Sequence, residues 1–585
     1  MFENEKEAID AKVREFCVKN GLPDVKLTWR NIPFRGEWGI AGPLFPLAAA
    51  ENRTNIETPV AQRAQILAER LAEYIGTPWG IKKVQAVKGY LNLYFSTAIQ
   101  TQKVTEQVMS QGDAYGKANP TGQVTMVEYS QPNTHKDLHV GHLRNVILGG
   151  AVSNILEAAG EKVVRANYIG DIGLHVIKWM WNYVKHHQGE EPGEDKTRWM
   201  GELYAEADRR FSDEPDFETE VRQYFVRWDK HDPEVVALWQ KTRQWSLDGF
   251  YQVYDLLGEH FDRIYFESEV EETGKAFVAD MIKYGQATDG RPDKPVFVNL
   301  DERLGTTEEY RVAVVLRSDG TSLYATKELP LAVLKFEEYH LNRSIYVVDV
   351  RQALHMKQIF KILEILGYEW ATRLVHLAYE VVNLPGNVTM SSRDGTVVLL
   401  SDLIREATQR ALEIVNEKNP ELSAARKQAI ASSVAIGAIK YPMLSRENTK
   451  IVTFDWESAM DFNGQSAPYI QYAHVRAGSI LRKASLDQPT GFAFKENLEN
   501  SEINLIEVIS KLPDEVQKAA SELKPSLIAN YAYELAKAFN EFYNTCPVLS
   551  ASGEKKNYRL ALVGAAKQCL KNSLDLLGIK APEVM

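Results

Sequence analysis

Hydrophobic and polar positions follow two different patterns along the chain. Up to about residue 400, short apolar runs of strand length alternate with segments in which apolar residues recur at helical spacing. From residue 402 onward, strand-like runs nearly vanish and helical spacing dominates. The pattern predicts an α/β first part and an all-helical last part, with helices at 402–417, 422–440, 465–485, 501–511, 525–544 and 556–577.

The α/β part divides again at about residue 117. Residues 1–117 predict a small α/β domain with helices at 3–19 and 60–75 and a strand pair at 83–87 and 90–96. Residues 118–400 predict a doubly wound parallel sheet, in which ligands bind at the carboxyl ends of the strands. Its strands are expected at 124–129, 163–168, 312–317, 344–350 and 374–382.

Further boundaries follow from composition along the chain. A polar, charged stretch followed by helical spacing predicts an insertion into the sheet at about 183–300. A helical connector is expected at 401–455 and a helical domain at 456–585. The fold class is therefore multidomain α/β with an all-α C-terminal domain.

Composition and charge narrow the class of protein. A chain of 585 residues is too long for one core, so several domains are expected. The net charge of −11 gives no support to a nucleic-acid partner, so such a partner would need a local basic arrangement. No apolar run approaches the roughly 20 residues of a membrane span, and the N-terminus has no signal core. Three scattered cysteines favour a reducing compartment, and we expect a cytoplasmic protein.

The most informative stretch runs from Val127 to Arg144 and reads VEYSQPNTHKDLHVGHLR. Its centre, His139-Val140-Gly141-His142, lies at a predicted strand-to-helix junction, where a helix N-terminus suits an anion. Gly141 lets a flat ring approach the backbone, and the two histidines can donate to phosphate oxygens. The tetrapeptide alone is also compatible with structural or metal-bound histidines, but this combination favours an ATP site.

The residues around this centre carry a family resemblance. Ser130-Gln131-Pro132-Asn133, Lys136 and Leu143-Arg144 extend the motif, which resembles the signature of class I aminoacyl-tRNA synthetases in its arginyl form. The resemblance implies a Rossmann-like catalytic domain that forms arginyl-adenylate from ATP, with Mg²⁺ on the phosphates, and releases pyrophosphate. It also implies transfer of arginine to the terminal ribose 2′-OH of tRNA(Arg), by an enzyme expected to be a monomer.

Arginine as a substrate requires carboxylates, because a guanidinium presents a planar fork of donors. Glu128 ends the first strand and Asn133 follows it, and both match residues that hold the amino acid in the family. Tyr324 and Glu328 resemble the family's Tyr-x-x-x-Asp segment, in which the Asp binds the guanidinium. The longer Glu328 moves the charge by about 1.5 Å, so either the pocket compensates or Glu328 takes another role. Gln352 and His355 resemble the family's Asp-Gln-x-x-His segment.

A second ATP loop is expected at residues 387–395, NVTMSSRDG. It resembles the Lys-Met-Ser-Lys-Ser loop of the class, with Thr389 in place of the first lysine; without the upstream motif it would pass for an ordinary surface turn. The resemblance implies that Lys136 replaces the missing cation, since negative charge builds on the phosphates as pyrophosphate leaves. The implied catalytic residues are Lys136, His139, His142 and Arg393, and the implied ATP-binding residues are His139, Gly141, His142, Met390, Ser391 and Ser392.

Two further segments resemble the tRNA-binding parts of the family. The strand at 89–95 is similar to one in the arginyl enzymes' extra N-terminal domain, which implies that Asn92 and Phe95 touch the tRNA corner. A helix after residue 465 resembles the start of the anticodon domain, with Tyr472 and Arg476 on one face, and Met585 ends the chain as in that family. The alternatives are a plain buried strand and a helix face that belongs to the core.

Two other functions remain open at the level of sequence. A non-catalytic tRNA-binding paralogue would show changes such as Glu328 and Thr389, although Lys136 and Arg393 are retained. A class I synthetase of other amino-acid specificity would lack the pairing of Glu128 with Asn133.

Overall fold

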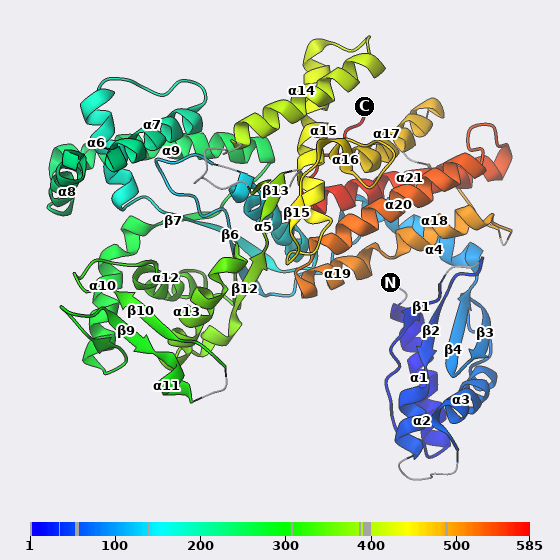
Figure 1. Cartoon of the computed structure of the whole chain (residues 1–585). Coiled ribbons are helices and arrows are strands. Elements are labelled where there is room, and N and C mark those ends of the chain that lie inside the picture. The colour runs from blue at the N-terminus through cyan, green and yellow to red at the C-terminus, as the bar shows by residue number, and fades with distance from the viewer. Residues whose placement is uncertain are drawn as a thin grey trace.

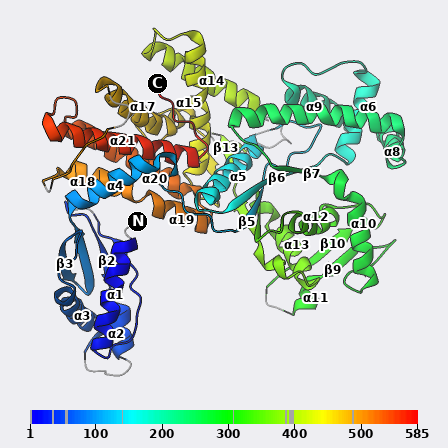
Figure 2. The same ribbon diagram turned by 180° about the vertical axis from the view of Figure 1, so that it is seen from behind.

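The computed structural model describes residues 3–33, 36–52, 58–138, 140–213, 215–305, 308–384, 388–389, 399–485, 489–495 and 497–585. Figure 1 shows three regions: a blue N-terminal module, a cyan-to-green α/β region and a yellow-to-red helical region. The helical region lies between the other two, as the view from behind in Figure 2 also shows.

The N-terminal module packs three helices against a four-stranded antiparallel sheet of order β1-β2-β4-β3. The elements are α1 (Glu3–Lys19), β1 (Arg30–Asn31), β2 (Gly39–Pro43), α2 (Phe45–Asn52), α3 (Val60–Ile75), β3 (Ile81–Val87) and β4 (Tyr90–Phe95). Buried residues recur on α3 every three or four positions, and Lys88 and Gly89 both have positive φ, as a two-residue hairpin turn requires. The two predicted helices and the predicted hairpin are confirmed.

The α/β region is built on a five-stranded parallel sheet of order β12-β11-β5-β6-β7. Its strands are β5 (Val124–Glu128), β6 (Lys162–Ile169), β7 (Arg263–Phe266), β11 (Arg343–Asp349) and β12 (Leu374–Tyr379). Chain order reverses between β5 and β11, so this is a doubly wound sheet whose crevice opens where those two strands end.

Helices cover both faces of this sheet. Val127 on β5 packs in one cluster with α5 (Val140–Ala158), whereas Met126 packs in another with α12 (Tyr324–Tyr339) and α13 (Ala353–Ile365). Because side chains alternate along a strand, Glu128 points to the same face as Met126, toward α12. The remaining helix of this face is α10 (Glu267–Lys283).

Two sequence predictions about this region are wrong. The strand predicted at 312–317 is β10 (Val312–Leu316), which does not belong to the parallel sheet. It lies in a separate antiparallel sheet with β9 (Val296–Asn299) and β8 (Thr288–Asp289). The short helix α11 (Leu300–Leu304) follows β9. Its exposed and buried residues alternate, as in a sheet with one open face.

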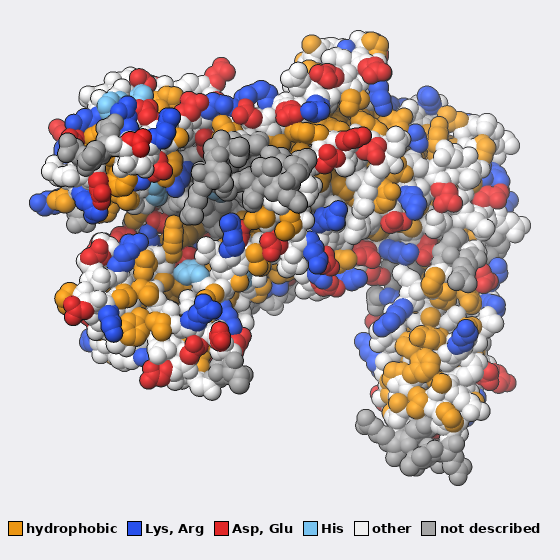
Figure 3. Space-filling view, viewed as in Figure 1, with side chains coloured by type: hydrophobic (Ala, Val, Ile, Leu, Met, Phe, Trp, Pro, Cys, Tyr) orange, Lys and Arg blue, Asp and Glu red, His pale blue; other side chains and the backbone are white. Residues whose placement is uncertain are grey.

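The insertion also has other bounds than 183–300, because that range contains β7, an edge strand of the parallel sheet. β7 is only four residues long, which left little apolar signal in the sequence. The insertion consists of α6 (Leu174–His186), α7 (Lys196–Asp213), α8 (Pro215–Asp229) and α9 (Pro233–Leu257). Figure 3 shows the surface hollowed between this insertion and the lobe of α10 to α13.

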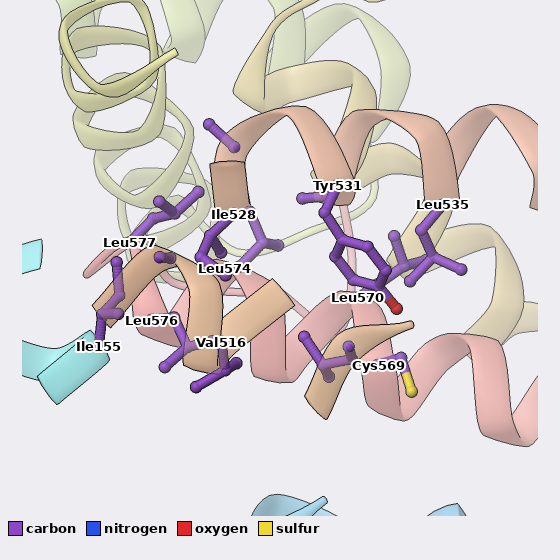
Figure 4. Packing of buried hydrophobic residues seen from close by; sticks show 14 of the residues in the cluster. Ile155, Val516, Ile528, Tyr531, Leu535, Cys569, Leu570, Leu574, Leu576 and Leu577 are labelled. Atoms are coloured by element: carbon purple, nitrogen blue, oxygen red, sulfur yellow. The ribbon is translucent and has the colours of Figure 1, made fainter. Parts of the chain in front are cut away.

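The helical region confirms the six predicted helices and adds α19. Its long helices are α14 (Leu400–Lys418), α15 (Ala424–Leu444), α17 (Ala467–Lys483), α18 (Asn500–Ser510), α19 (Leu512–Glu522), α20 (Pro525–Thr545) and α21 (Gly553–Leu576). Short elements are β13 (Val382–Leu384), β14 (Val388–Thr389), β15 (Val452–Thr453) and α16 (Trp456–Ala459). In Figure 4, Ile155 of α5 lies with Val516 of α19 and Ile528 of α20, so the α/β and helical regions share one core.

The connection from the N-terminal module is also anchored on the helical region. Helix α4 (Thr97–Gln111) packs against α18 and α21, as both ribbon views show. Beyond it, the Tyr115 hydroxyl donates to the carbonyl of Ile509 (3.2 Å), and Asn572 donates to the carbonyl of Tyr115 (3.0 Å).

None of the helices in the described ranges is long and apolar enough to cross a membrane.

Candidate active site

The loop after β5 is held in an unusual backbone conformation. Three of its residues have left-handed φ: Ser130, Gln131 and His135. Such a φ costs about 1 kcal/mol or more per residue, so the surroundings must stabilise it. Helix α9 of the insertion does so through buried hydrogen bonds: the hydroxyls of Ser130 and Tyr254 are 2.7 Å apart, and Nε2 of His135 lies 2.8 Å from the hydroxyl of Thr242. The insertion therefore shapes the loop that carries the motif.

A cavity of about 260 Å³, here called the central cavity, opens where β5, β6 and β11 end. The residues predicted to hold arginine all line it: Glu128, Asn133, Tyr324, Glu328 and Gln352. His355 lines it as well. Sequence reasoning missed several other lining residues: Gln131, Tyr168, Glu267, Lys335 and Tyr346.

Helix α12 supplies one whole wall of the central cavity. Its lining residues are Tyr324, Glu328, Leu331 and Lys335, spaced by four, three and four positions, which places them on one helix face. Tyr324 is 60% exposed at the mouth, whereas Lys335 is fully buried. This spacing is the signal in the sequence that could have identified Lys335.

Glu128 forms a buried ion pair. It is 3% exposed, its carboxylate contacts the ammonium of Lys335, and its Oε1 accepts a hydrogen bond from Gln131 (2.9 Å). Burial alone would lower the pKa of Lys335, but the Glu128 carboxylate outweighs it and raises that pKa. Glu128 is therefore held in a fixed position in the wall of the central cavity, and it is not a solvated strand end.

Glu328 lies one turn after Tyr324 and pairs with His355 of α13. Burial tends to lower the pKa of His355, yet the hydrogen bond to Glu328 prevails and raises it. The side chain that is longer than the family's aspartate thus still presents its carboxylate to the central cavity.

A third carboxylate and a hydroxyl complete the polar lining. Glu267 accepts from Lys327 at 2.5 Å, and burial raises the pKa of Glu267 although Lys327 opposes that shift. The hydroxyl of Tyr168 is buried and has no hydrogen-bond partner among the described residues. Burial raises the pKa of Tyr168 well above its usual value, so this hydroxyl is a donor available to a ligand.

The predicted ATP side lies at the N-terminal end of α5. Gly141 and His142 stand half-buried in its first turn. Lys136 has its Nζ 4.7 Å from the ring centroid of Tyr204 and forms no ion pair within the described part of the chain. Burial lowers the pKa of Lys136, as expected for a cation that lacks a counterion. His139, Met390, Ser391, Ser392 and Arg393 lie outside the described residues.

Arg144 connects α5 to the strands at which the predicted second ATP loop begins. Its guanidinium donates to the carbonyls of Lys450 (2.9 Å) and Asn448 (3.2 Å), beside β15. β15 pairs with β13, which in turn pairs with β14, where that loop begins. Burial lowers the pKa of Arg144 to about 10. The motif arginine therefore links the first turns of α5 to the strand pair that precedes the predicted second ATP loop.

The predicted anticodon residues come together on one surface, here called the C-terminal face. It comprises Lys418, Phe462, Tyr472, Arg476 and Met585. All of these except Arg476 line one small cavity, and Arg476 lies over the ring of Tyr472. The guanidinium of Arg476 lies 4.8 Å from the ring centroid of Tyr472. Both residues are half-buried, and the Arg476 guanidinium also donates to Oδ1 of Asn540 (2.7 Å). Lys418, which sequence reasoning missed, stands 4.5 Å from the ring centroid of Phe462.

The predicted tRNA contacts of the N-terminal module need correction. Phe95 is 1% exposed and packs edge-on against Trp38, so it offers no surface to a nucleic acid and its predicted tRNA contact is wrong. Asn92 is 8% exposed and donates to the Tyr94 hydroxyl (3.1 Å). β4 is an inner strand of the sheet, and both of its faces are largely covered. A strand motif alone could not reveal this double coverage.

The chain is similar to known proteins in both sequence and structure. The family model described as "tRNA synthetases class I (R), catalytic domain" matches residues 104–456, and the "DALR anticodon binding domain" matches residues 470–585. The chain is 33% identical to an arginine–tRNA ligase of Clostridium botulinum over 565 residues, 95% of each chain. It is 36% identical to that of Bdellovibrio bacteriovorus over 506 residues, 85% of this chain and 86% of the other. The structure also aligns with the solved Thermus thermophilus arginyl-tRNA synthetase. The alignment covers 100% of each chain, with a TM-score of 0.82 at 27% identity.

Proposed function

The chain belongs to the arginine–tRNA ligases, a family of class I aminoacyl-tRNA synthetases, and from this we propose how its own residues divide the reaction. It ligates arginine to tRNA(Arg) at the expense of ATP. This excludes the alternative of another amino-acid specificity and favours catalysis over a non-catalytic role.

We propose that the central cavity binds arginine. Glu328 receives the guanidinium, with Tyr324 and Gln352 beside it, because a carboxylate matches the planar fork of donors. Glu128 and Asn133 hold the amino-acid end, since Glu128 ends β5 and Asn133 lies on the loop that leads from it to α5. The observation that carries this assignment is that the five predicted residues, which come from three separate segments of the chain, line one cavity.

The first step joins the arginine carboxylate to the α-phosphate of ATP and releases pyrophosphate. Lys136 and His142, with His139 and Arg393, stabilise the charge that builds on the phosphates. The ammonium of Lys136 forms no ion pair with the described residues, which supports a role for it in binding the phosphates. Gly141, Met390, Ser391 and Ser392 complete the proposed ATP site.

Mg²⁺ is proposed to arrive on ATP. Within the described ranges, no group of three His, Cys, Asp or Glu residues could hold a metal ion. Mg²⁺ keeps several waters and binds through phosphate oxygens, so it enters the reaction as part of the ATP substrate.

In the second step the terminal ribose 2′-OH of tRNA(Arg) attacks the adenylate. We propose that the C-terminal face contacts the anticodon, with Tyr472 and Arg476 stacking on bases and Met585 beside them. The domain division proposed is an N-terminal module, a catalytic domain with insertion, a helical connector and an anticodon domain. The enzyme is proposed to act as a cytoplasmic monomer.

The test is aminoacylation of tRNA(Arg) with labelled arginine, with lysine and cysteine as competing amino acids. Arginine alone should enter tRNA, and tRNA(Lys) should stay uncharged. Transfer of lysine at a comparable rate would contradict the proposed carboxylate site.

A further inference from the structure

The carboxylates of the central cavity each have a basic partner from the protein itself. The pairs are Glu128 with Lys335, Glu267 with Lys327, and Glu328 with His355. Each of these carboxylates lines the cavity. With all three bases protonated, the charges of the pairs cancel.

The three bases differ in how firmly they hold their protons. Lysine stays protonated at neutral pH, and Lys335 even more so because Glu128 raises its pKa. Histidine changes charge in the physiological range. His355 is therefore the cavity base whose proton can be lost, and its loss leaves one negative charge on Glu328.

Arginine carries one net positive charge, so it matches the form of the cavity in which His355 is neutral. A guanidinium and an imidazolium cannot both be stabilised fully by one carboxylate, because two like charges side by side repel. The ammonium groups of Lys335 and Lys327 remain committed to their own partners.

We propose that His355 is an internal competitor for Glu328: as imidazolium it holds the carboxylate while the cavity is empty, and it gives up its proton when the arginine guanidinium binds. In this exchange the N–H bond at Nε2 breaks, the proton passes to solvent, and the hydrogen bond from His355 to Glu328 is replaced by bonds from arginine. The inference rests on the proposed assignment of the central cavity as the arginine site.

The other titratable groups around His355 do not account for the proposed proton release. Helix α12 contributes Tyr324 and Lys327 beside Glu328, helix α10 contributes Glu267, and strands β6 and β11 contribute Tyr168 and Tyr346. Burial raises the pKa of each of these tyrosines, so they stay neutral. In the turn just before α13, Arg351 is paired with Asp349 (2.8 Å). Among the described residues, the hydrogen-bond partner of the imidazole is Glu328.

The sign of the pH effect follows from linkage. In the empty enzyme Glu328 raises the pKa of His355 above its ordinary value. A bound guanidinium neutralises Glu328 and adds a like charge, so the pKa falls. Arginine affinity is then full above the higher pKa and weakens as pH falls through it, by up to about tenfold per pH unit.

The experiment is calorimetric titration of the full-length enzyme with arginine, near pH 6.5, in two buffers of different ionisation enthalpy. The difference in apparent enthalpy gives the number of protons released, and a pH series gives the Kd. We expect release of a fraction of a proton approaching one, and a Kd that rises on acidification.

Two variants make the test specific. In His355→Gln the amide can still donate to Glu328 but cannot titrate, so proton release and the pH dependence of Kd should disappear. The matched control is His187→Gln in the insertion, because His187 also pairs with carboxylates (Glu206 at 2.9 Å) and also has a raised pKa. That control should keep the wild-type proton release.

The outcomes separate this inference from the proposed function. Arginine binding to the wild-type enzyme without proton release, or unchanged release in a folded His355→Gln variant, would overturn the role of His355 and leave the arginine site intact. Absence of arginine binding at every pH would contradict the arginine site itself. If His355→Gln failed to fold, the wild-type comparison of the two buffers would still decide.

Discussion

The central cavity and the C-terminal face place charged side chains in opposite environments. In the cavity, Lys335 and Glu128 are buried together, and each depends on the other. On the C-terminal face, Arg476 and Lys418 are cations lying over aromatic rings at the surface. A buried charge without its partner is costly, whereas a surface cation keeps its water. Changes in the cavity should therefore have much larger effects than changes on the face.

The largest effect is expected for Lys335→Met. It leaves Glu128 buried and unpaired, which should lower the free energy of unfolding by about 3–5 kcal/mol. Denaturant unfolding measures this loss. The double variant Glu128→Gln with Lys335→Met should recover most of the stability, because no buried charge remains. A loss below about 1 kcal/mol for the single variant would mean that the two environments do not differ as described.

Lys136→Ala should come next. Removing this cation from the proposed phosphate site should lower kcat by roughly 10²–10³-fold and leave tRNA affinity nearly unchanged. Steady-state kinetics and filter binding measure the two quantities. Lys185→Ala on α6 is the matched control, since Lys185 pairs with Glu220 away from the site (3.0 Å). Equal losses of turnover and tRNA affinity would remove Lys136 from the chemical step.

Glu328→Gln should raise the KM for arginine by roughly 10–100-fold, the range expected when one hydrogen bond to a charged group is lost. The KM for ATP should change little. Glu338→Gln is the control on the same helix, because Glu338 accepts from Tyr265 (3.0 Å) outside the cavity. An unchanged arginine KM in Glu328→Gln would place the guanidinium elsewhere.

The smallest effect is expected on the C-terminal face. Arg476→Ala should weaken tRNA(Arg) binding by about 1 kcal/mol, roughly fivefold, and reduce discrimination between tRNAs, because it removes one stacking cation. Arginine and ATP kinetics should not change. Lys483→Ala, an exposed residue of the same helix, should leave selectivity intact. Selectivity that survived Arg476→Ala would favour a purely structural role.

Sequence reasoning succeeded where one signal was sufficient. Helical spacing predicted α1 and α3, and the motifs brought Glu128 and Glu328 to one cavity. β10 was misplaced because alternation predicts a strand but not its neighbours. Partners were missed for the same reason, since nothing local to Lys335 shows that it faces Glu128 across the fold.

The N-terminal module shows the limit of motif matching. The strand that carries Asn92 and Phe95 was found, yet both side chains are largely covered. Which face of a strand is open depends on what packs against it, and that information lies in distant residues such as Trp38. The net charge of −11 was equally uninformative, because a tRNA enzyme needs cations only at local surfaces.

Arginine-dependent ATP–pyrophosphate exchange, measured with and without tRNA(Arg) and with lysine as the control amino acid, tests most directly whether the central cavity activates arginine. We predict exchange that requires arginine and is absent with lysine. No exchange with arginine, in the presence or absence of tRNA(Arg), would contradict the assignment of the cavity.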